Sequence, residues 1–220
     1  MKRLYIAVLI AGLFASCNST DKNKQEPSAS ETATDSSKTI SKNLVPIDSD
    51  EALVTTALMA APEGSRDGCK VIGFNMAGEF VTFREGTNEF VVIVDDHTRS
   101  GFNAACYHKD LEPFMARGRE LRAKGKTAVE IFDIREAEAK SGKLDMGTPG
   151  STLHIYYGPD TQFDPETSKV ENAIYRYVVY LPFATAESTG LPETPVSPNH
   201  PWIMNPGTHR AHIMISPVNE

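Results

Sequence analysis

The sequence predicts an α+β domain: an antiparallel β-sheet with a central helix pair packed on one face. Segments rich in β-branched and aromatic residues lie on both sides of residues 110–142, where apolar residues recur at helical spacing. Residues 90–94 are apolar throughout, as in a strand that is covered on both faces. Strands, two helices and strands again, without internal repeats, predict a single domain over residues 47–220.

Before the central helices, the sequence predicts one short helix and three strands. Ser49 or Asp50 can cap the helix, and Pro62 ends it. The two strands on either side of Glu85-Gly86-Thr87-Asn88 are expected to pair as a hairpin. The apolar residues of the first of these two strands do not alternate cleanly, because Phe80 and Phe83 are three residues apart. The expected strands are residues 69–75, 79–84 and 89–94.

Helix signals in the middle of the chain are local and well spaced. Asp110 is the expected cap of the first helix, and Gly125 suits its end. Thr127 and Glu130 form a capping-box pattern for the second helix, which ends near Gly142. The final part of the chain is expected to return to strands at residues 152–157, 175–181 and 211–216.

Charge and motif content exclude some functions. The chain has 220 residues and a formal net charge of −7, so a broad basic surface for nucleic acid is not expected. The sequence contains no phosphate loop, dinucleotide fingerprint, nucleophile elbow or H-E-x-x-H zinc motif. It therefore favours a protein that is not an enzyme, and it specifies no cofactor.

The first residues are typical of an exported protein. Lys2 and Arg3 precede an apolar run over residues 4–14, and two small residues stand directly before Cys17. This order resembles the lipobox of bacterial lipoproteins. The resemblance implies that residues 1–16 are a signal peptide and that Cys17 is acylated with palmitate-like chains, which anchor the protein in a membrane. The alternative is an ordinary secretory signal followed by an unrelated cysteine.

The segment that follows is expected to be a disordered tether. Residues 17–46 begin with the lipidated cysteine and are rich in Ser and Thr, with balanced charges and little to bury. By resemblance to enteric lipoproteins, Asn18 in place of Asp implies delivery to the outer membrane. The segment lacks a dense acidic run, which favours the side that faces the periplasm.

Two cysteines remain after Cys17. In an oxidising compartment Cys69 and Cys106 can form one disulfide, which would contribute about 3–4 kcal/mol. The alternative is two separately buried thiols. Cys106 and His108 could also pair as a nucleophile and its base, although residues two apart need not meet. The sequence leaves these alternatives open.

The histidines near the C-terminus are candidate metal ligands. His209 and His212, with His200 or His154, supply the three imidazoles that an open zinc or copper site needs. However, His212 begins an expected strand, so His209 and His212 would tend to point apart. The alternative is that each histidine satisfies a local hydrogen bond.

A second polar cluster follows the expected central strand. Asp95, Asp96 and His97 are followed by Arg99, and a histidine beside carboxylates can serve as a general base. The alternative is a solvated turn. Trp202, the only tryptophan, lies among prolines and could form the floor of a ligand groove or cover the edge of the sheet.

A basic patch stands out on the otherwise acidic chain. We interpret it as a solvated helix face, with contact to anionic lipid or to a carboxylate ligand as the alternative. Its residues are Arg117, Arg119, Arg122, Lys124 and Lys126.

Two motifs carry a resemblance over residues 70–217. They are R-E-G-T-N at residues 84–88 and G-T-x-x-A-H-I-M at residues 207–214. The chain is similar in both to an uncharacterised group of secreted bacterial proteins and lipoproteins, which also have a cysteine near Cys106. Many members carry a further cysteine where this chain has Val92. No activity is known for the group, so the resemblance implies export and a shared fold only.

Taken together, these patterns predict a membrane-anchored envelope lipoprotein that acts as a binding or structural module. Its partners would be the lipid bilayer, through Cys17, and a protein or small molecule that the sequence does not identify. The alternative is a small metal-dependent or histidine-based periplasmic hydrolase that uses His209, His212 and the region of Asp96 and His97.

Overall fold

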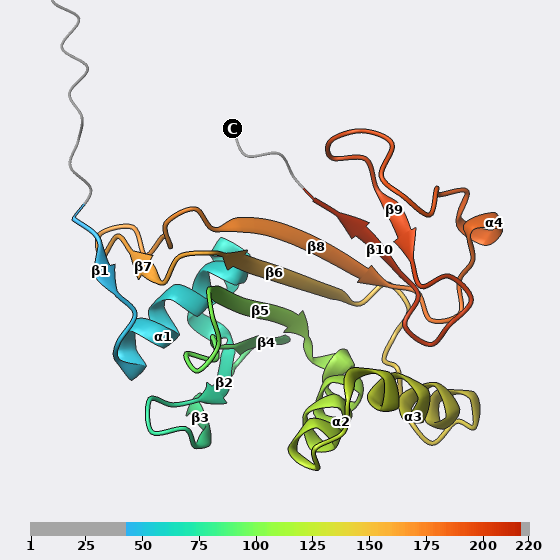
Figure 1. Cartoon of the computed structure of the whole chain (residues 1–220), viewed down its shortest axis with the longest axis horizontal. Helices are drawn as coiled ribbons and strands as arrows, with labels where there is room; N and C mark the ends of the chain where they lie inside the picture. Colours follow the sequence, from blue (N-terminus) through green and yellow to red (C-terminus); the bar gives the residue numbers. More distant parts are fainter. Residues whose placement is uncertain (1–42, 217–220) are drawn as a thin grey trace, which may run out of the picture. The chain divides into compact units, whose positions relative to one another are not determined.

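Eight strands form the main sheet of residues 43–216, the part of the chain that the computed structural model describes (Figure 1). The order of the strands across the sheet is β3-β2-β4-β5-β6-β8-β10-β9. They are β2 (Lys70–Phe74), β3 (Phe80–Arg84), β4 (Phe90–Ile93), β5 (Phe102–His108), β6 (Thr152–Gly158), β8 (Ile174–Tyr180), β9 (Trp202–Met204) and β10 (His212–Ile215). The predicted α+β class is confirmed, but the sheet is mixed, because β2 and β4 run parallel while the other neighbours run antiparallel.

The predicted hairpin on either side of residues 85–88 is wrong. Strand β2 lies between β3 and β4, pairing antiparallel with the first and parallel with the second. The true hairpin joins β2 to β3, and its register shifts between Val71 and Ile72. The sequence pattern misleads because residues 85–88 do not turn back on themselves. They cross the start of β2, where the backbone N–H groups of Thr87 and Asn88 donate to the Gly68 carbonyl.

Both faces of the sheet are buried at its central strands. On one face, Val92 and Cys106 pack with helix α1 (Asp50–Ala57). On the other, Val91 and Tyr107 pack with Phe114 of helix α2 (Glu112–Ala123). Successive residues of β4 therefore enter opposite cores, which confirms the expectation of a strand that is covered on both faces.

Hydrogen bonds to nearby side chains cap the first turns of helices α1 and α3 (Ala128–Lys140). Ser49 caps α1 as expected, and Thr127 and Glu130 form the predicted capping box at the start of α3. The expected cap at Asp110 is wrong. A 3₁₀ turn, η3 (Lys109–Leu111), precedes α2, and within it the side chain of His108 accepts from the Asp110 N–H.

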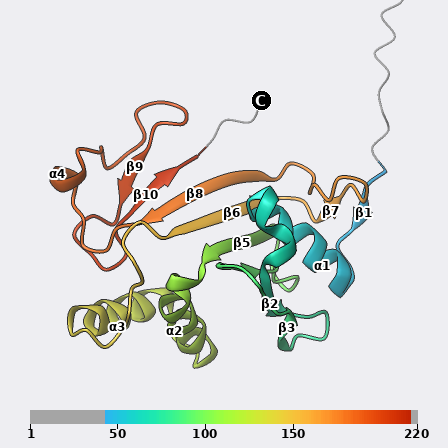
Figure 2. The same cartoon turned by 180° about the vertical axis from the view of Figure 1, so that it is seen from behind.

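Helices α2 and α3 differ in their contacts with the sheet. Phe114 of α2 packs edge to face on Tyr180 of β8, with ring centroids 5.4 Å apart. Helix α3 reaches this core through Arg135, whose guanidinium lies over the Phe114 ring, and through Phe132, which contacts His209. Figures 1 and 2 show α2 and α3 near one end of β5 and α1 near its other end.

The sequence did not predict several elements, most of them short. Strand β5 was missed because its sequence, FNAACYH, mixes small and polar residues and lacks a run of β-branched ones. Two further short strands, β1 (Val45–Pro46) and β7 (Gln162–Phe163), form a separate two-stranded sheet. Two 3₁₀ turns, η1 (Leu58–Ala60) and η2 (Glu63–Gly68), connect α1 to β2, and α4 (Ala186–Thr189) follows β8.

The folded unit starts before the predicted boundary at residue 47. The chain divides into Met1–Ile40 and Ser41–Glu220, and Val45 already pairs with Phe163. The predicted signal peptide, Cys17 and most of the predicted tether lie outside the described residues. Within residues 43–216, no helix is both long and apolar enough to cross a membrane.

The capping box of α3 gives a first prediction. Thr127→Ala removes the hydroxyl that accepts from the Glu130 N–H, so the free energy of unfolding should fall by about 1 kcal/mol. Urea denaturation followed by circular dichroism measures this change. Thr161→Ala is the matched control, because the Thr161 side chain is exposed and makes no hydrogen bond among the described residues. Equal losses in the two variants would contradict the prediction.

Candidate functional site

A large concavity lies between the β2–β3 hairpin, the loop after β4, and helix α2. Two adjoining hollows of about 400 and 490 Å³ share a set of lining side chains that we call the Phe–Arg cleft. In Figures 1 and 2 the hairpin and α2 lie on the same side of β5. The residues common to both hollows are Phe74, Phe80, Asp96, Arg99, Arg119 and Arg122.

Two phenylalanines give the cleft an apolar wall. Phe74 ends β2 and Phe80 begins β3, and they are 40% and 47% exposed. Their rings pack edge to face with centroids 5.3 Å apart. Two large aromatic side chains that leave this much apolar surface in water are unusual away from a binding site. In the sequence, the only indication of this apolar wall is that the apolar residues of the strand around Phe80 do not alternate cleanly with polar ones.

The basic patch of α2 is mostly neutralised by carboxylates. Arg117 pairs with Glu120 and Glu138, Arg119 with Glu112, Lys124 with Glu120, and Lys126 with Glu130. Arg122 differs from these four residues, because its guanidinium makes no ion pair or hydrogen bond within residues 43–216. The one unpaired charge of the patch therefore lines the Phe–Arg cleft.

A partly buried network positions Arg119 beside the apolar wall. The fully buried Tyr107 donates its hydroxyl proton to Glu112, which also binds the Arg119 guanidinium. Burial and this contact with Glu112 raise the pKa of Tyr107, so the phenol stays protonated. Arg119 then lies over the Phe80 ring, 5.6 Å from its centroid, in a cation–π contact.

The predicted acidic cluster forms the end of the cleft, and its carboxylates are already bonded. Asp95 is buried and accepts from the Asn103 N–H at 2.9 Å, and burial is the main reason that its pKa is raised. Asp96 accepts from the Thr98 hydroxyl and from Arg99, and these bonds lower its pKa. His97 does not line the cleft. The cluster therefore holds the loop after β4 in place.

The candidate metal ligands are not brought together. The Nδ1 atom of His209 lies 2.6 Å from Glu136, while His212 donates from Nδ1 to the Arg210 carbonyl at 2.7 Å. His200 lies in the loop before β9, and His154 lies on β6. Within residues 43–216, no group of three or more His, Cys, Asp or Glu side chains is arranged to hold a metal ion.

His209 instead fastens the C-terminal segment to α3. Its backbone N–H and its ring Nδ1 both meet the Glu136 carboxylate, and its ring packs against Phe114 and Phe132. Burial lowers the pKa of His209 despite this carboxylate. Burial alone would raise the pKa of Glu136, but hydrogen bonds from Lys140 and His209 outweigh it and lower the pKa to about 2.

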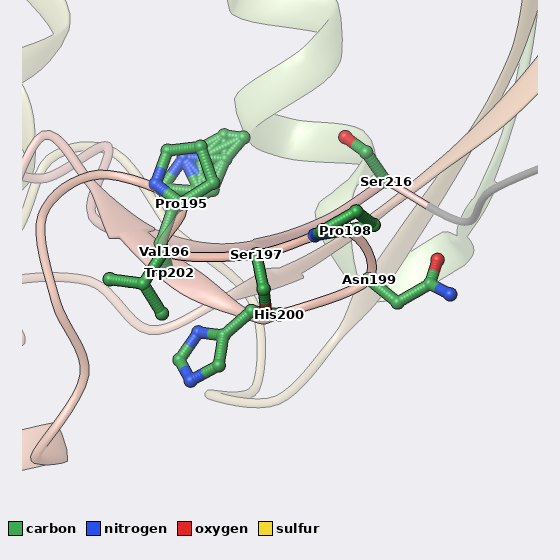
Figure 3. A pocket seen from close by; sticks show the side chains of 8 residues that line it. All are labelled: Pro195, Val196, Ser197, Pro198, Asn199, His200, Trp202 and Ser216. Carbon is green, nitrogen blue, oxygen red and sulfur yellow. The ribbon is translucent and has the colours of Figure 1, made fainter. Parts of the chain in front are cut away.

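The loop before β9 covers a second hollow of about 370 Å³ (Figure 3). Trp202 lines this hollow, as expected if it formed the floor of a ligand groove. The other residues that line the hollow are prolines, serines, Val196, Asn199 and His200. Figure 3 shows His200 and Ser216 on opposite sides of the hollow. No Asp, Glu, Lys or Arg side chain lines this hollow, so it offers a ligand fewer charged groups than the Phe–Arg cleft does.

A third hollow, of about 380 Å³, adjoins a row of tyrosines that the sequence did not single out. Tyr156 stacks on Tyr175, which stacks in turn on Tyr177. The Tyr175 hydroxyl already donates to the Met59 carbonyl, and His154 bonds the backbone of Ala60. These polar groups therefore fasten η1 to the sheet.

The Cys106–His108 pair does not form a nucleophile and its base. The Nδ1 atom of His108 accepts from the Asp110 N–H at 3.3 Å, and its ring packs against Phe90. The Cys106 thiol is buried instead in the same core as Cys69.

Compared with known proteins, the chain matches no protein-family model, no curated protein and no solved structure. The function must therefore be inferred from the geometry of the site.

The buried histidines predict a loss of stability in mild acid. Burial lowers the pKa of His154, His209 and His212, whereas in the unfolded chain histidine has a pKa of about 6.5. The unfolded state therefore binds more protons below about pH 6.5, and the free energy of unfolding falls as the pH drops through that window. The raised pKa of Asp95 has the opposite effect, but only at lower pH. As the pH falls from the pKa of Asp95 in the folded state to its pKa in the unfolded state, the folded state takes up the proton first and the free energy of unfolding rises.

Urea denaturation at pH 7.5 and pH 5.5 measures the effect. We expect a lower midpoint at pH 5.5 and a smaller difference between the two pH values in His212→Gln, which cannot titrate. An unchanged midpoint in the parent chain would contradict the assignment of neutral buried histidines.

Proposed function

We propose that this chain is a ligand-binding module whose Phe–Arg cleft takes an amphipathic anion. The observation that supports this most is the unpaired guanidinium of Arg122 in the same cleft as the exposed rings of Phe74 and Phe80. An aromatic or acyl group would cover the rings, and a carboxylate, phosphate or sulfonate would pair with Arg122.

The chemistry of the cleft favours binding over catalysis. Asp95 and Asp96 already accept hydrogen bonds, and Arg119 is engaged by Glu112 and Tyr107. None of the histidines proposed for a hydrolase lines the cleft. A ligand would therefore meet two aromatic rings and one free cation, and no side chain poised to transfer a proton.

We further propose that the module works at the cell envelope as a lipoprotein. The support comes from the leader, in which a basic start and an apolar run precede Cys17, and from the resemblance of residues 84–88 and 207–214 to secreted bacterial proteins of unknown activity. Acylation of Cys17 would tether the domain to the outer membrane, facing the periplasm, and would raise its local concentration near envelope ligands.

A pair of fluorescent probes tests the ligand class. 1-Anilinonaphthalene-8-sulfonate and N-phenyl-1-naphthylamine share the same aromatic body, but only the first carries an anion. Residues 41–220 should bind the sulfonate more tightly, and Arg122→Gln should weaken its binding about tenfold while leaving the neutral probe unaffected. Phe80→Ala should weaken the binding of both probes. Fluorescence titration gives the Kd values.

Lys143→Gln is the matched control, because it removes an exposed charge outside the cleft. Circular dichroism on each variant separates lost binding from lost folding. If the parent domain binds both probes equally, or if Lys143→Gln weakens sulfonate binding as much as Arg122→Gln does, the proposed anion site is wrong.

Membrane attachment has its own test. In Cys17→Ser the thiol that would carry the acyl chains is absent, so the protein should move from the membrane fraction to the soluble fraction of cells that express it. Cys69→Ser is the control and should stay with the membranes. Incorporation of labelled palmitate should follow the same pattern, and label in Cys17→Ser would contradict acylation at this residue.

A further inference from the structure

The two remaining cysteines meet in one core. Cys69 directly precedes β2, Cys106 lies on β5, and both are completely buried. They belong to the cluster that also holds Val71 and Val92 and is covered by α1. Both are free thiols in this structure and influence each other's pKa, although 36 residues lie between them along the chain.

Residues 84–88, the R-E-G-T-N motif, hold Cys69 in this position, and we call them the clamp. Arg84 Nε donates to the Cys69 carbonyl at 3.0 Å, and its guanidinium also binds the Arg66 carbonyl. Asn88 Nδ2 donates to the Ser65 carbonyl at 2.7 Å, the carbonyl to which the Cys69 thiol also donates. The clamp therefore bonds the backbone of Cys69 itself and of the segment that precedes it.

Gly86 allows the clamp to lie this close. A Cβ atom at this position would stand 2.5 Å from the Lys70 backbone nitrogen, which belongs to the residue directly after Cys69. Any larger residue at position 86 must push β2 or the clamp away. The motif is thus explained by its contact with the segment that carries Cys69.

The surroundings also make Cys69 the more acidic thiol. The neighbouring Cys106 thiol is the largest influence, and together with Asn88, Arg84 and Arg66 it lowers the pKa of Cys69 to about 7. The same contact and burial raise the pKa of Cys106. A thiolate at Cys69 is the species that would attack an oxidant in thiol–disulfide exchange.

We propose that Cys69 and Cys106 form a disulfide in the mature protein, and that the clamp is the device that aligns Cys69 for it. The bond forms while the chain folds and the thiols are still accessible. The Cys69 thiolate attacks a disulfide of a protein oxidant or of oxidised glutathione, and one thiol of that oxidant leaves. Cys106 then attacks the sulfur of Cys69 in this mixed disulfide and displaces the second thiol, so that two electrons and the protons of both cysteines pass to the oxidant, which leaves as two thiols.

The proposal rests on the envelope location in one respect, since oxidants of this class act outside the cytoplasm. The alignment of Cys69 with Cys106 does not depend on where the protein is located, so formation of the bond is testable with the purified protein in a buffer. Once formed, the bond lies in a core without solvent access, so it should resist reductants until the protein unfolds.

The experiment uses the full chain in mild detergent. The protein is reduced in denaturant, refolded with oxidised and reduced glutathione, alkylated with N-ethylmaleimide and digested with trypsin. We expect one main product in which the tryptic peptide of residues 67–70 is linked to that of residues 100–109. Cys69→Ser and Cys106→Ser should lack it. Recovery of both parent cysteines as alkylated thiols would overturn the proposal.

Two further experiments test separately the role of the clamp and the envelope location. Gly86→Ala should form the linked product several-fold more slowly, whereas Gly64→Ala should match the parent, because nothing lies within 4 Å of a Cβ atom there. Equal rates would overturn the role of the clamp. In cells quenched with the alkylating agent, the linked peptide should also be found. A bond that forms in the buffer but is absent from cells would overturn the envelope location, and not the geometry.

Discussion

The burial of strand β4 on both faces is the constraint on which the rest of this fold depends. Val91 and Val92 are neighbours in the chain, yet they belong to different cores. A strand of this kind needs cover above and below the sheet, and the chain supplies it with α1 on one face and α2 on the other. The position of α2 follows from this need, and α2 in turn places Arg119 and Arg122 opposite the β2–β3 hairpin. The candidate site is thus a consequence of how the central strand is covered.

Local signals in the sequence predicted local structure well. The cap at Ser49, the capping box at Thr127, and the covered strand at residues 90–94 depend on neighbouring residues alone, and the structure confirms them. The order of the strands depends on distant pairing. Residues 85–88 have the composition of a turn, but Thr87 and Asn88 donate to the carbonyls of Gly68 and Ser65, which a pattern of neighbours cannot reveal.

The site was predicted only in parts, and for a related reason. Both Asp96 and the basic patch were recognised, but nothing in the sequence showed that they meet in one cleft. Nor could it show which basic residues are neutralised, because Glu138, which pairs with Arg117, lies on another helix. Arg122 stands out only once those ion pairs are known. The histidines show the opposite case, since their spacing suggested a metal site while His209 and His212 each have a separate partner.

The β2–β3 hairpin carries one further consequence, which concerns contact between copies of the protein. Strand β3 is an edge of the sheet, so its outer backbone groups are open to a strand from another molecule, and Phe80 would add apolar contact to such a pairing. The strand has only five residues, and its pairing with β2 is irregular at Val71 and Ile72. A short and locally distorted edge is a poor template for continued pairing. The same hairpin therefore combines an exposed aromatic side chain at the cleft with an edge that does not favour strand pairing.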